Sequence, residues 1–114
     1  MRVVHAYIRR ALAARVIGQL QEAGCRTLSI LEVRGLTPDV AASGLDPSVE
    51  FAQSVEAMIK LEIVGSDEDV ARWADVIARA AHTGKAGDGL VAVLPVHSAM
   101  PISSGKDTLG DQGH

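Results

Sequence analysis

The sequence is poor in cysteine and lacks long apolar runs. Cys25 is the single cysteine among 114 residues, which excludes an internal disulfide and with it a small secreted scaffold held by several bridges. No apolar stretch reaches the roughly 18 residues that a membrane-spanning helix needs. The chain starts with a strand-like alternation and not with a signal peptide. We therefore expect one cytoplasmic domain, residues 1–114, without membrane insertion.

Positive charge is not in excess either. The 11 lysine and arginine residues stand against 14 aspartate and glutamate residues, which gives a net charge of −3 and argues against a nucleic-acid binder. Apolar residues make up 47% of the chain and aromatic residues 3%, so we expect an aliphatic interior. So much apolar content without bulky anchors indicates that some apolar surface is left for a partner subunit.

Hydrophobic periodicity predicts four strands and two helices. The strands are expected at residues 2–8, 27–33, 58–64 and 90–96. One helix is expected at residues 12–23, with Gly24 as a left-handed cap and Gly18 at a close backbone approach. A second helix is expected to start after the N-cap Ser66 and to end at His82. The order β-α-β-β-α-β is typical of a ferredoxin-like α+β sandwich.

A long loop joins the second and third predicted strands. Residues 35–57 contain Pro38, Gly44 and Pro47 and keep neither a helical nor a strand period. Loops of this length are usually functional or disordered. All charged side chains of this loop are carboxylates. The tail, residues 97–114, is polar and is expected to be irregular.

One face of the predicted sheet is left without a helix. The strand periods place on it His5, Tyr7, Leu31, Val33, Lys60 and Glu62. This mixture is too apolar to suit free water, so we expect a homo-oligomer to cover it.

The segment Thr83–Gly89 is rich in glycine and could form an anion-binding nest from its backbone amides. It is not a Walker A loop, because it lacks Gly-Lys-Ser/Thr and leads from a helix to a strand. The preceding helix presents its negative end, so Lys85 and the amides would have to attract a phosphate. On spacing alone, a simple helix-to-strand connection that needs glycines is the plainer interpretation.

No catalytic residue is predicted, because nothing resembles a nucleophile elbow. The four histidines show neither HxH nor HxxxH spacing, and no metal ligand is assigned. A metal site built from His82, His97 and acidic loop residues stays open as an alternative. The simpler role for His82 is that of a cation that stabilises the negative C-terminal end of a helix.

Several segments together resemble one known family. They are Glu32–Gly35 before the loop, Lys60–Val64 after it, Ala81–Gly89, and Ser104–Lys106. With this spacing, the chain resembles the P-II signal-transduction family. The resemblance implies a homotrimer whose long loops contact partner proteins, with adenine-nucleotide sites in the clefts between subunits. It implies no required cofactor.

The resemblance also implies site residues. Ser29 would lie near the base, Gly35 at the loop root, and Glu62 with Val64 at the adenine edge. Backbone amides of the turn would meet phosphate, with Lys85 beside them. The nucleotide-binding set is therefore Ser29, Gly35, Glu62, Val64, Lys85, Gly87, Asp88 and Gly89, and the partner-binding loop residues are Asp39, Ser43, Asp46, Ser48, Glu50 and Phe51.

Departures from the family pattern change the expected ligand. Cations of the family are replaced here by Pro38, Leu90, Pro101 and Ser103. A charge-assisted hydrogen bond is worth about 1.5–3 kcal/mol, so their loss weakens triphosphate binding most. Asp39 and Met58 stand where the family binds 2-oxoglutarate, and Phe51 replaces the tyrosine that many members have uridylylated. We expect neither a 2-oxoglutarate response nor that modification.

These observations predict a non-catalytic regulator that senses AMP or ADP rather than ATP and controls a partner, such as a membrane transporter, through its loop. The alternative is an adaptor that ignores nucleotides and binds a small anion, for example bicarbonate, or a metal through the loop. A slow ATPase is a third hypothesis, disfavoured because the missing cations would also stabilise the transition state.

Overall fold

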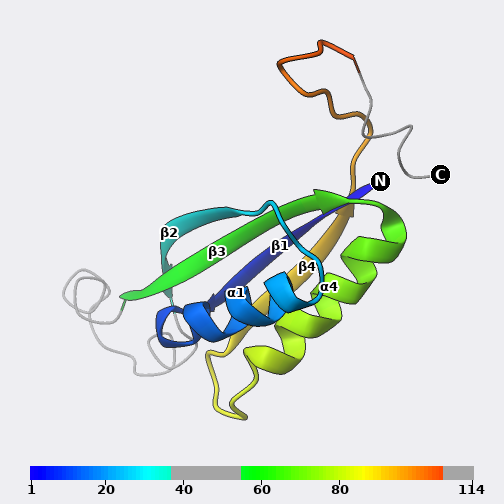
Figure 1. Cartoon of the computed structure of the whole chain (residues 1–114). Coiled ribbons are helices and arrows are strands. Elements are labelled where there is room, and N and C mark those ends of the chain that lie inside the picture. The colour runs from blue at the N-terminus through cyan, green and yellow to red at the C-terminus, as the bar shows by residue number, and fades with distance from the viewer. Residues whose placement is uncertain (37–54, 107–114) are drawn as a thin grey trace.

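The fold is a four-stranded antiparallel sheet with two helices packed on one face (Figure 1). The computed structural model describes residues 1–36 and 55–106. Its strands follow the order β2-β3-β1-β4 across the sheet. The elements are β1 (Arg2–Arg9), the short 3-10 helix η1 (Arg10–Leu12), α1 (Ala13–Glu22), β2 (Ser29–Leu36), β3 (Val55–Gly65), α4 (Asp67–Ala80) and β4 (Gly89–Pro95). The predicted ferredoxin-like α+β architecture is confirmed.

The core lies between the sheet and the helices, and it is aliphatic as expected. Alternate residues of β1 and β3 point into it and meet the apolar stripes of α1 and α4. Among the described residues, Trp73 is the aromatic side chain buried there, and its indole N–H donates to the Ala23 carbonyl over 3.4 Å. The most deeply buried side chains include Val4, Ile8, Val16, Leu20, Leu61, Ile63, Val70 and Ile77.

The ends of the helices follow local sequence signals. Ser66 is the N-cap of α4, because its hydroxyl accepts a hydrogen bond from the Asp69 amide at 3.1 Å. Gly24 follows α1 with φ of +90°, the left-handed conformation predicted for it. The expectation for Gly18 was wrong: a Cβ built there meets no atom within 4 Å, so no backbone of the described residues approaches it closely.

The two strands that flank the long loop extend further than their sequence pattern indicated. β2 runs on to Leu36 and β3 begins at Val55, and these two residues are paired. Five residues of the predicted loop therefore belong to the sheet, since backbone pairing does not require alternating side chains. Figure 1 shows this pair of strands reaching beyond the rest of the sheet. Residues 37–54, which hold the centre of the loop, lie outside the described residues.

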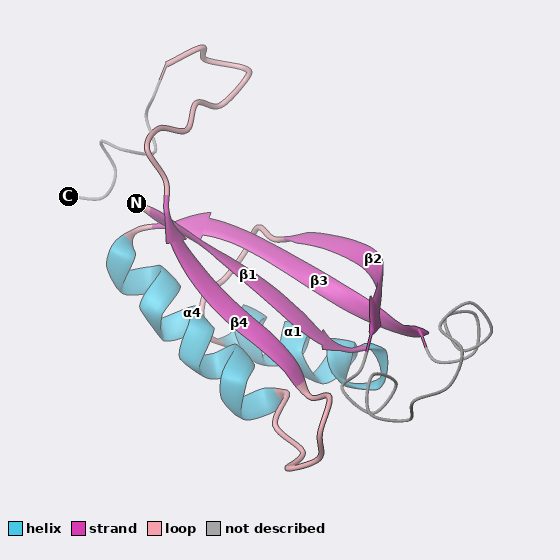
Figure 2. Cartoon of the chain, turned by 180° about the vertical axis from the view of Figure 1, so that it is seen from behind, coloured by secondary structure: helices cyan, strands magenta, loops and turns pink. Residues whose placement is uncertain are grey.

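The C-terminal end of β4 leads into an irregular segment. The Val96 amide donates to the Met1 carbonyl over 3.2 Å, and from there to Lys106 the chain forms no strand or helix. Figure 2 shows this segment rising away from the sheet. Among the described residues, no helix has the length and apolar character needed to cross a membrane.

The face of the sheet opposite the helices is open (Figure 2). The register sets Leu31, Lys60 and Tyr7 side by side across three strands, and Ser29, Glu62 and His5 in the next row. Five of these six residues were predicted for this face, Ser29 being the addition, and the sixth predicted residue, Val33, follows two positions after Leu31 and pairs with Met58. Large apolar side chains on it stay exposed in one chain, namely Leu31, Val64, Leu90 and Leu94. A second copy is one way to remove that surface from water.

Candidate nucleotide-binding cleft and turn

A cleft of about 500 Å³ lies beside the start of β2 and the end of β3. Three of the residues that the resemblance assigns to the base line it together: Ser29, Glu62 and Val64. The antiparallel register explains this, because Ser29 is paired with Glu62. The rest of the lining comes from the end of α1, the segment before β2, and α4, through Gly24, Arg26, Thr27, Leu28 and Trp73.

The carboxylate in this cleft is held in its charged form. Lys60 Nζ lies 2.9 Å from Glu62 Oε1, and this hydrogen bond lowers the pKa of the Glu62 carboxyl and raises the pKa of the Lys60 amine. Lys60 also lies over the Tyr7 ring, 5.4 Å from its centroid. The cleft thus offers a fixed hydrogen-bond acceptor beside apolar surface.

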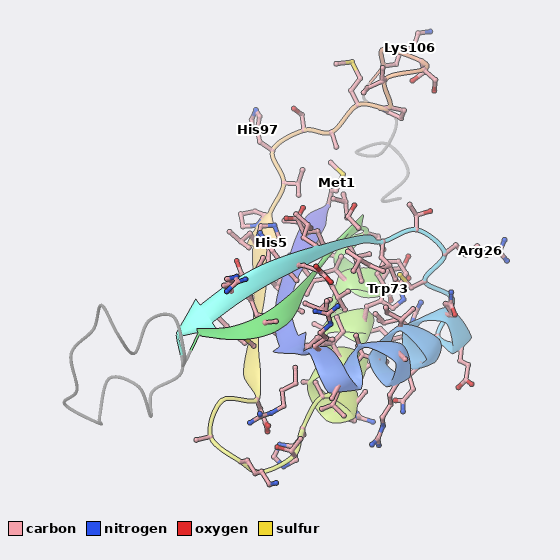
Figure 3. The ribbon with its side chains drawn as sticks, turned by 90° about the vertical axis from the view of Figure 1, so that its left-hand side faces the viewer. Met1, His5, Arg26, Trp73, His97 and Lys106 are labelled. Atoms are coloured by element: carbon pink, nitrogen blue, oxygen red, sulfur yellow. The ribbon has the colours of Figure 1, made fainter. Side chains whose placement is uncertain are left out.

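Sequence reasoning missed four of the side chains in the cleft. Arg26, Thr27 and Leu28 directly precede Ser29, so their closeness could have been predicted from the chain. Trp73 comes from α4, and nothing in the local sequence connects it with β2. Figure 3 shows Arg26 reaching outward from the segment before β2, while Trp73 lies within the body of the domain.

The turn between α4 and β4 is built around one carboxylate. Asp88 Oδ2 accepts hydrogen bonds from the amides of Thr83, at 2.8 Å, and Gly84, at 3.1 Å. Asp88 Oδ1 accepts from the Thr83 hydroxyl and from Arg9 Nε, the latter at 3.2 Å. These donors, those of Thr83 first, hold the pKa of the Asp88 carboxyl well below its ordinary value.

The glycines of this turn have the backbone conformation that only glycine adopts easily. Gly84, Gly87 and Gly89 have φ of +85°, +88° and +120°. A Cβ at Gly89 would lie 1.8 Å from the Tyr7 carbonyl oxygen. The turn therefore needs its glycines to fold, whatever it binds.

Arg9, at the end of β1, is a part of the turn that the sequence did not reveal. Its Nη2 donates to the Ala86 carbonyl over 2.7 Å, in addition to its contact with Asp88. Arg9 precedes Asp88 by 79 residues, and the antiparallel pairing of β1 with β4 brings them together. No motif could have indicated this pair.

Part of the turn is left open to an anion. In the described part of the chain, the amides of Gly87 and Asp88 donate to no protein acceptor. Lys85 is exposed, and its amide donates to the Thr83 hydroxyl over 3.1 Å. The Asp88 side chain is committed to the turn itself, so a ligand would meet the backbone of this residue and not its carboxylate.

The cleft and the turn are separate on one chain. Glu62 is paired with His5, and Gly89 is paired with Ile8 on the other side of β1. Glu62 and Gly89 are separated by three residues along the strands and by two strand spacings across the sheet, which is about 10 Å in each of these directions. The hollow of about 260 Å³ beside the turn shares no lining residue with the cleft. Gly35 lies further along β2, paired with Glu56.

The alternative metal site finds no support in the described residues. His82 and His97 lie beyond opposite ends of β4, and His82 Nδ1 is 3.7 Å from Asp88 Oδ2 instead. No group of three or more histidine, cysteine or acidic side chains within residues 1–36 and 55–106 could hold a metal. The loop residues predicted to bind a partner lie outside the described residues, namely Asp39, Ser43, Asp46, Ser48, Glu50 and Phe51.

Known proteins match nearly the whole chain. The family model described as "Nitrogen regulatory protein P-II" matches residues 1–106. The nitrogen regulatory protein GlnK2 of Haloferax mediterranei is 34% identical over 106 residues, which cover 93% of this chain and 86% of that protein. The nitrogen regulatory protein P-II of Bradyrhizobium diazoefficiens is 31% identical over 109 residues, covering 96% and 97%.

A third relative is named after a nitrogen-fixation region. The nitrogen fixation nifHD1 region GlnB-like protein 1 of Methanosarcina barkeri is 33% identical over 109 residues, covering 96% of this chain and 100% of that protein. The full-length matches agree with the fold, with the resemblance drawn from the motifs, and with the expectation that the chain is not an enzyme. The chain belongs to the nitrogen regulatory protein P-II family and is a non-catalytic regulatory protein.

Proposed function

We propose that this regulator senses AMP or ADP rather than ATP in clefts between the subunits of a homotrimer. Through the loop that joins β2 to β3 it controls a partner protein, such as a membrane transporter. The observation that carries the proposal is the cleft that gathers Ser29, Glu62 and Val64. The partner and the nucleotide preference are inferences from this cleft, from the turn and from the family.

The cleft has the chemistry that a purine base needs. Val64, Leu28 and Trp73 give it apolar surface for a flat ring. Glu62 is an ionised acceptor for an exocyclic amine, and Ser29 adds a hydroxyl that can donate or accept. Such a site discriminates by hydrogen bonding, because a base without a suitable donor would form no hydrogen bond with the Glu62 carboxylate, which Lys60 already pairs.

The phosphate end is poor in uncommitted cations. Arg9 is bound to Asp88, and the exposed position that follows Gly89 is occupied by Leu90. Pro101 and Ser103 supply no charge where the family has arginines. Each further phosphate adds negative charge without a matching partner, so affinity should not rise from AMP or ADP to ATP.

Two features favour a site shared between subunits. The cleft and the turn lie about 10 Å apart in each direction along the sheet of one chain, and the hollows beside them share no lining residue. The open face of the sheet exposes Leu31, Val64, Leu90 and Leu94, which a second copy would cover. Light scattering should give the mass of three chains, and the mass of one chain would overturn this part of the proposal.

Substitution of the cleft carboxylate tests the base site. Glu62→Ala should weaken AMP and ADP binding about tenfold, the value of a charge-assisted hydrogen bond at a partly exposed position. Glu68→Ala is the matched control, since Glu68 is exposed in the first turn of α4 and does not line the cleft. Equal dissociation constants for the two variants would contradict the assignment of the base to this cleft.

Removal of the loop tests the partner site. Because Leu36 pairs with Val55, a glycine linker can replace residues 38–53 without breaking the sheet. The shortened protein should keep the mass and nucleotide affinity of the wild type and lose the proteins that the full chain retains in affinity purification. Retention of the same proteins by both chains would contradict a partner site on the loop.

A further inference from the structure

The cleft beside the start of β2 contains a positive charge as well as a carboxylate. We propose that Arg26, with the hydroxyls of Thr27 and Ser29, forms an anion subsite inside this cleft and binds a phosphoryl group on the ribose of the bound nucleotide. This inference rests on the proposed function, because it adds a contact to the same cleft. The subsite is separate from the turn between α4 and β4.

The segment between α1 and β2 holds Arg26 at the rim of the cleft. Gly24 ends the helical conformation with φ of +90°, and the Cys25 amide then donates to the Leu20 carbonyl over 2.9 Å. Cys25 is buried in the core, and Leu28 packs against the core. The two residues between these anchors are exposed, and Figure 3 shows Arg26 reaching outward from this segment. The backbone at Arg26 is therefore fixed, although it belongs to neither a helix nor a strand.

Arg26 gives the cleft a positive charge that no described carboxylate neutralises. Among the described residues that line the cleft, Arg26 and Glu62 are the two that carry charge. Glu62 is paired with Lys60 over 2.9 Å, whereas no ion pair within residues 1–36 and 55–106 involves Arg26. This holds for Glu22 too, the carboxylate nearest to Arg26 along the chain. The wall next to the base site therefore favours an anion.

The neighbours of Arg26 supply the other donors that an anion needs. Thr27 and Ser29 line the same cleft, and each has a hydroxyl that can donate. In the described part of the chain, the amides of Arg26 and Thr27 donate to no protein acceptor. A guanidinium can bind one phosphate with two parallel N–H groups, which gives it both charge and direction.

The anion and the base belong to one ligand. Ser29 is paired with Glu62, so the donors of the subsite begin next to the acceptor that is assigned to the base. The cleft of about 500 Å³ has the size of a small-molecule site and can hold both groups. The ligand class is therefore a nucleoside with a phosphoryl group on its sugar. The 5′, 3′ and 2′ monophosphates of adenosine differ in the position of this group, so a comparison of the three locates it relative to Arg26.

Isothermal titration of adenosine and its three monophosphates into variant proteins tests the subsite. At least one monophosphate should bind the wild type about tenfold more tightly than adenosine, and Arg26→Gln should lose this gain. Adenosine should bind both proteins within about twofold. Arg15→Gln is the matched control, because Arg15 is exposed in the first turn of α1 and does not line the cleft. It should bind all four compounds as the wild type does.

Two results would overturn the proposal. One is an equal affinity of Arg26→Gln and Arg15→Gln for every monophosphate, and the other is a wild type that binds no monophosphate more tightly than adenosine. Arg26→Lys separates a contact with phosphate from a loss of packing, because its ammonium keeps the charge without the two parallel donors. It should recover part of the gain, and an affinity no better than that of Arg26→Gln would count against a charge contact.

Trp73 provides a second readout in the same cleft. It is the single tryptophan of the chain and lines the cleft, so its fluorescence reports whether the cleft is occupied. The monophosphate that binds most tightly should change this fluorescence at about tenfold higher concentration in Arg26→Gln than in the wild type. Saturation at the same concentration in both proteins would contradict the subsite.

Inorganic phosphate tells this inference apart from the proposed function. If the wild type binds neither adenosine nor a monophosphate, the proposed function fails, and phosphate alone is titrated while the amide signals of Thr27 and Ser29 are followed by NMR. Phosphate must then shift these signals in the wild type and Arg15→Gln at lower concentration than in Arg26→Gln. No shift in the wild type, or the same titration curve in Arg26→Gln, would overturn the inference by itself. If adenosine binds but Arg26→Gln changes nothing, the base site stands and the subsite falls.

Discussion

Replacement of Leu90 by lysine should raise the affinity for ATP. Leu90 directly follows the turn and is 61% exposed, so less than half of its side chain is removed from water. Full burial of a leucine is worth about 1.5–3 kcal/mol, and the lysine stem keeps part of the contact, so Leu90→Lys should cost the fold about 1 kcal/mol or less. A new ammonium beside the amides of the turn should contribute about 1 to 1.5 kcal/mol to phosphate binding after screening by water, or about tenfold in affinity.

The assay is a titration of AMP, ADP and ATP into the wild type and two variants. Ala71→Lys is the control, because Ala71 is exposed near the start of α4, at the other end of that helix from the turn. Leu90→Lys should tighten ATP binding about tenfold, and Ala71→Lys should not change it beyond about twofold. Light scattering must give both variants the mass of the wild type. Equal ATP affinities in the two variants would refute the placement of phosphate at the turn.

Three further predictions concern stability. Gly89→Ala should lower the free energy of unfolding in urea by at least about 3 kcal/mol, because its Cβ would collide with the Tyr7 carbonyl at a φ of +120°; a midpoint close to that of the wild type would contradict the close approach. Ser66→Ala should cost about 1 kcal/mol by removing the acceptor of the Asp69 amide, which the same urea titration measures. Because folding lowers the pKa of Asp88, its stabilising contribution is complete above the ordinary value of 3.8 and is lost as the pH falls below it. Urea titrations across this range should show a weaker pH dependence in Asp88→Asn, and identical slopes would count against this role.

The sequence was informative where the signal is local. Ser66 followed by three acidic residues predicts a helix start, and the structure shows the cap hydrogen bond. Alternation within single strands was enough to place His5, Tyr7 and Lys60 on the open face, because the side-chain period of a strand is two. The antiparallel register of β2 and β3 then pairs Ser29 with Glu62, so no further sequence signal is needed to bring the two residues together.

The sequence was uninformative where the structure depends on distant partners. Residues 34–36 and 55–57 pair through their backbones, so their side chains give no clear sign of a strand. The contact of Arg9 with Asp88 joins residues 79 positions apart. Gly18 led to a wrong prediction. A glycine inside a helix suggests that another backbone packs closely against it, but Gly18 faces open space here.

The central claim is a nucleotide site that prefers AMP or ADP. It is tested most directly by isothermal titration of AMP, ADP and ATP into the full-length wild type, with and without bicarbonate. The account predicts micromolar dissociation constants for AMP or ADP and weaker binding of ATP, on the order of tenfold or more. ATP binding tighter than ADP binding would contradict it, and no binding of any nucleotide would favour the nucleotide-independent adaptor.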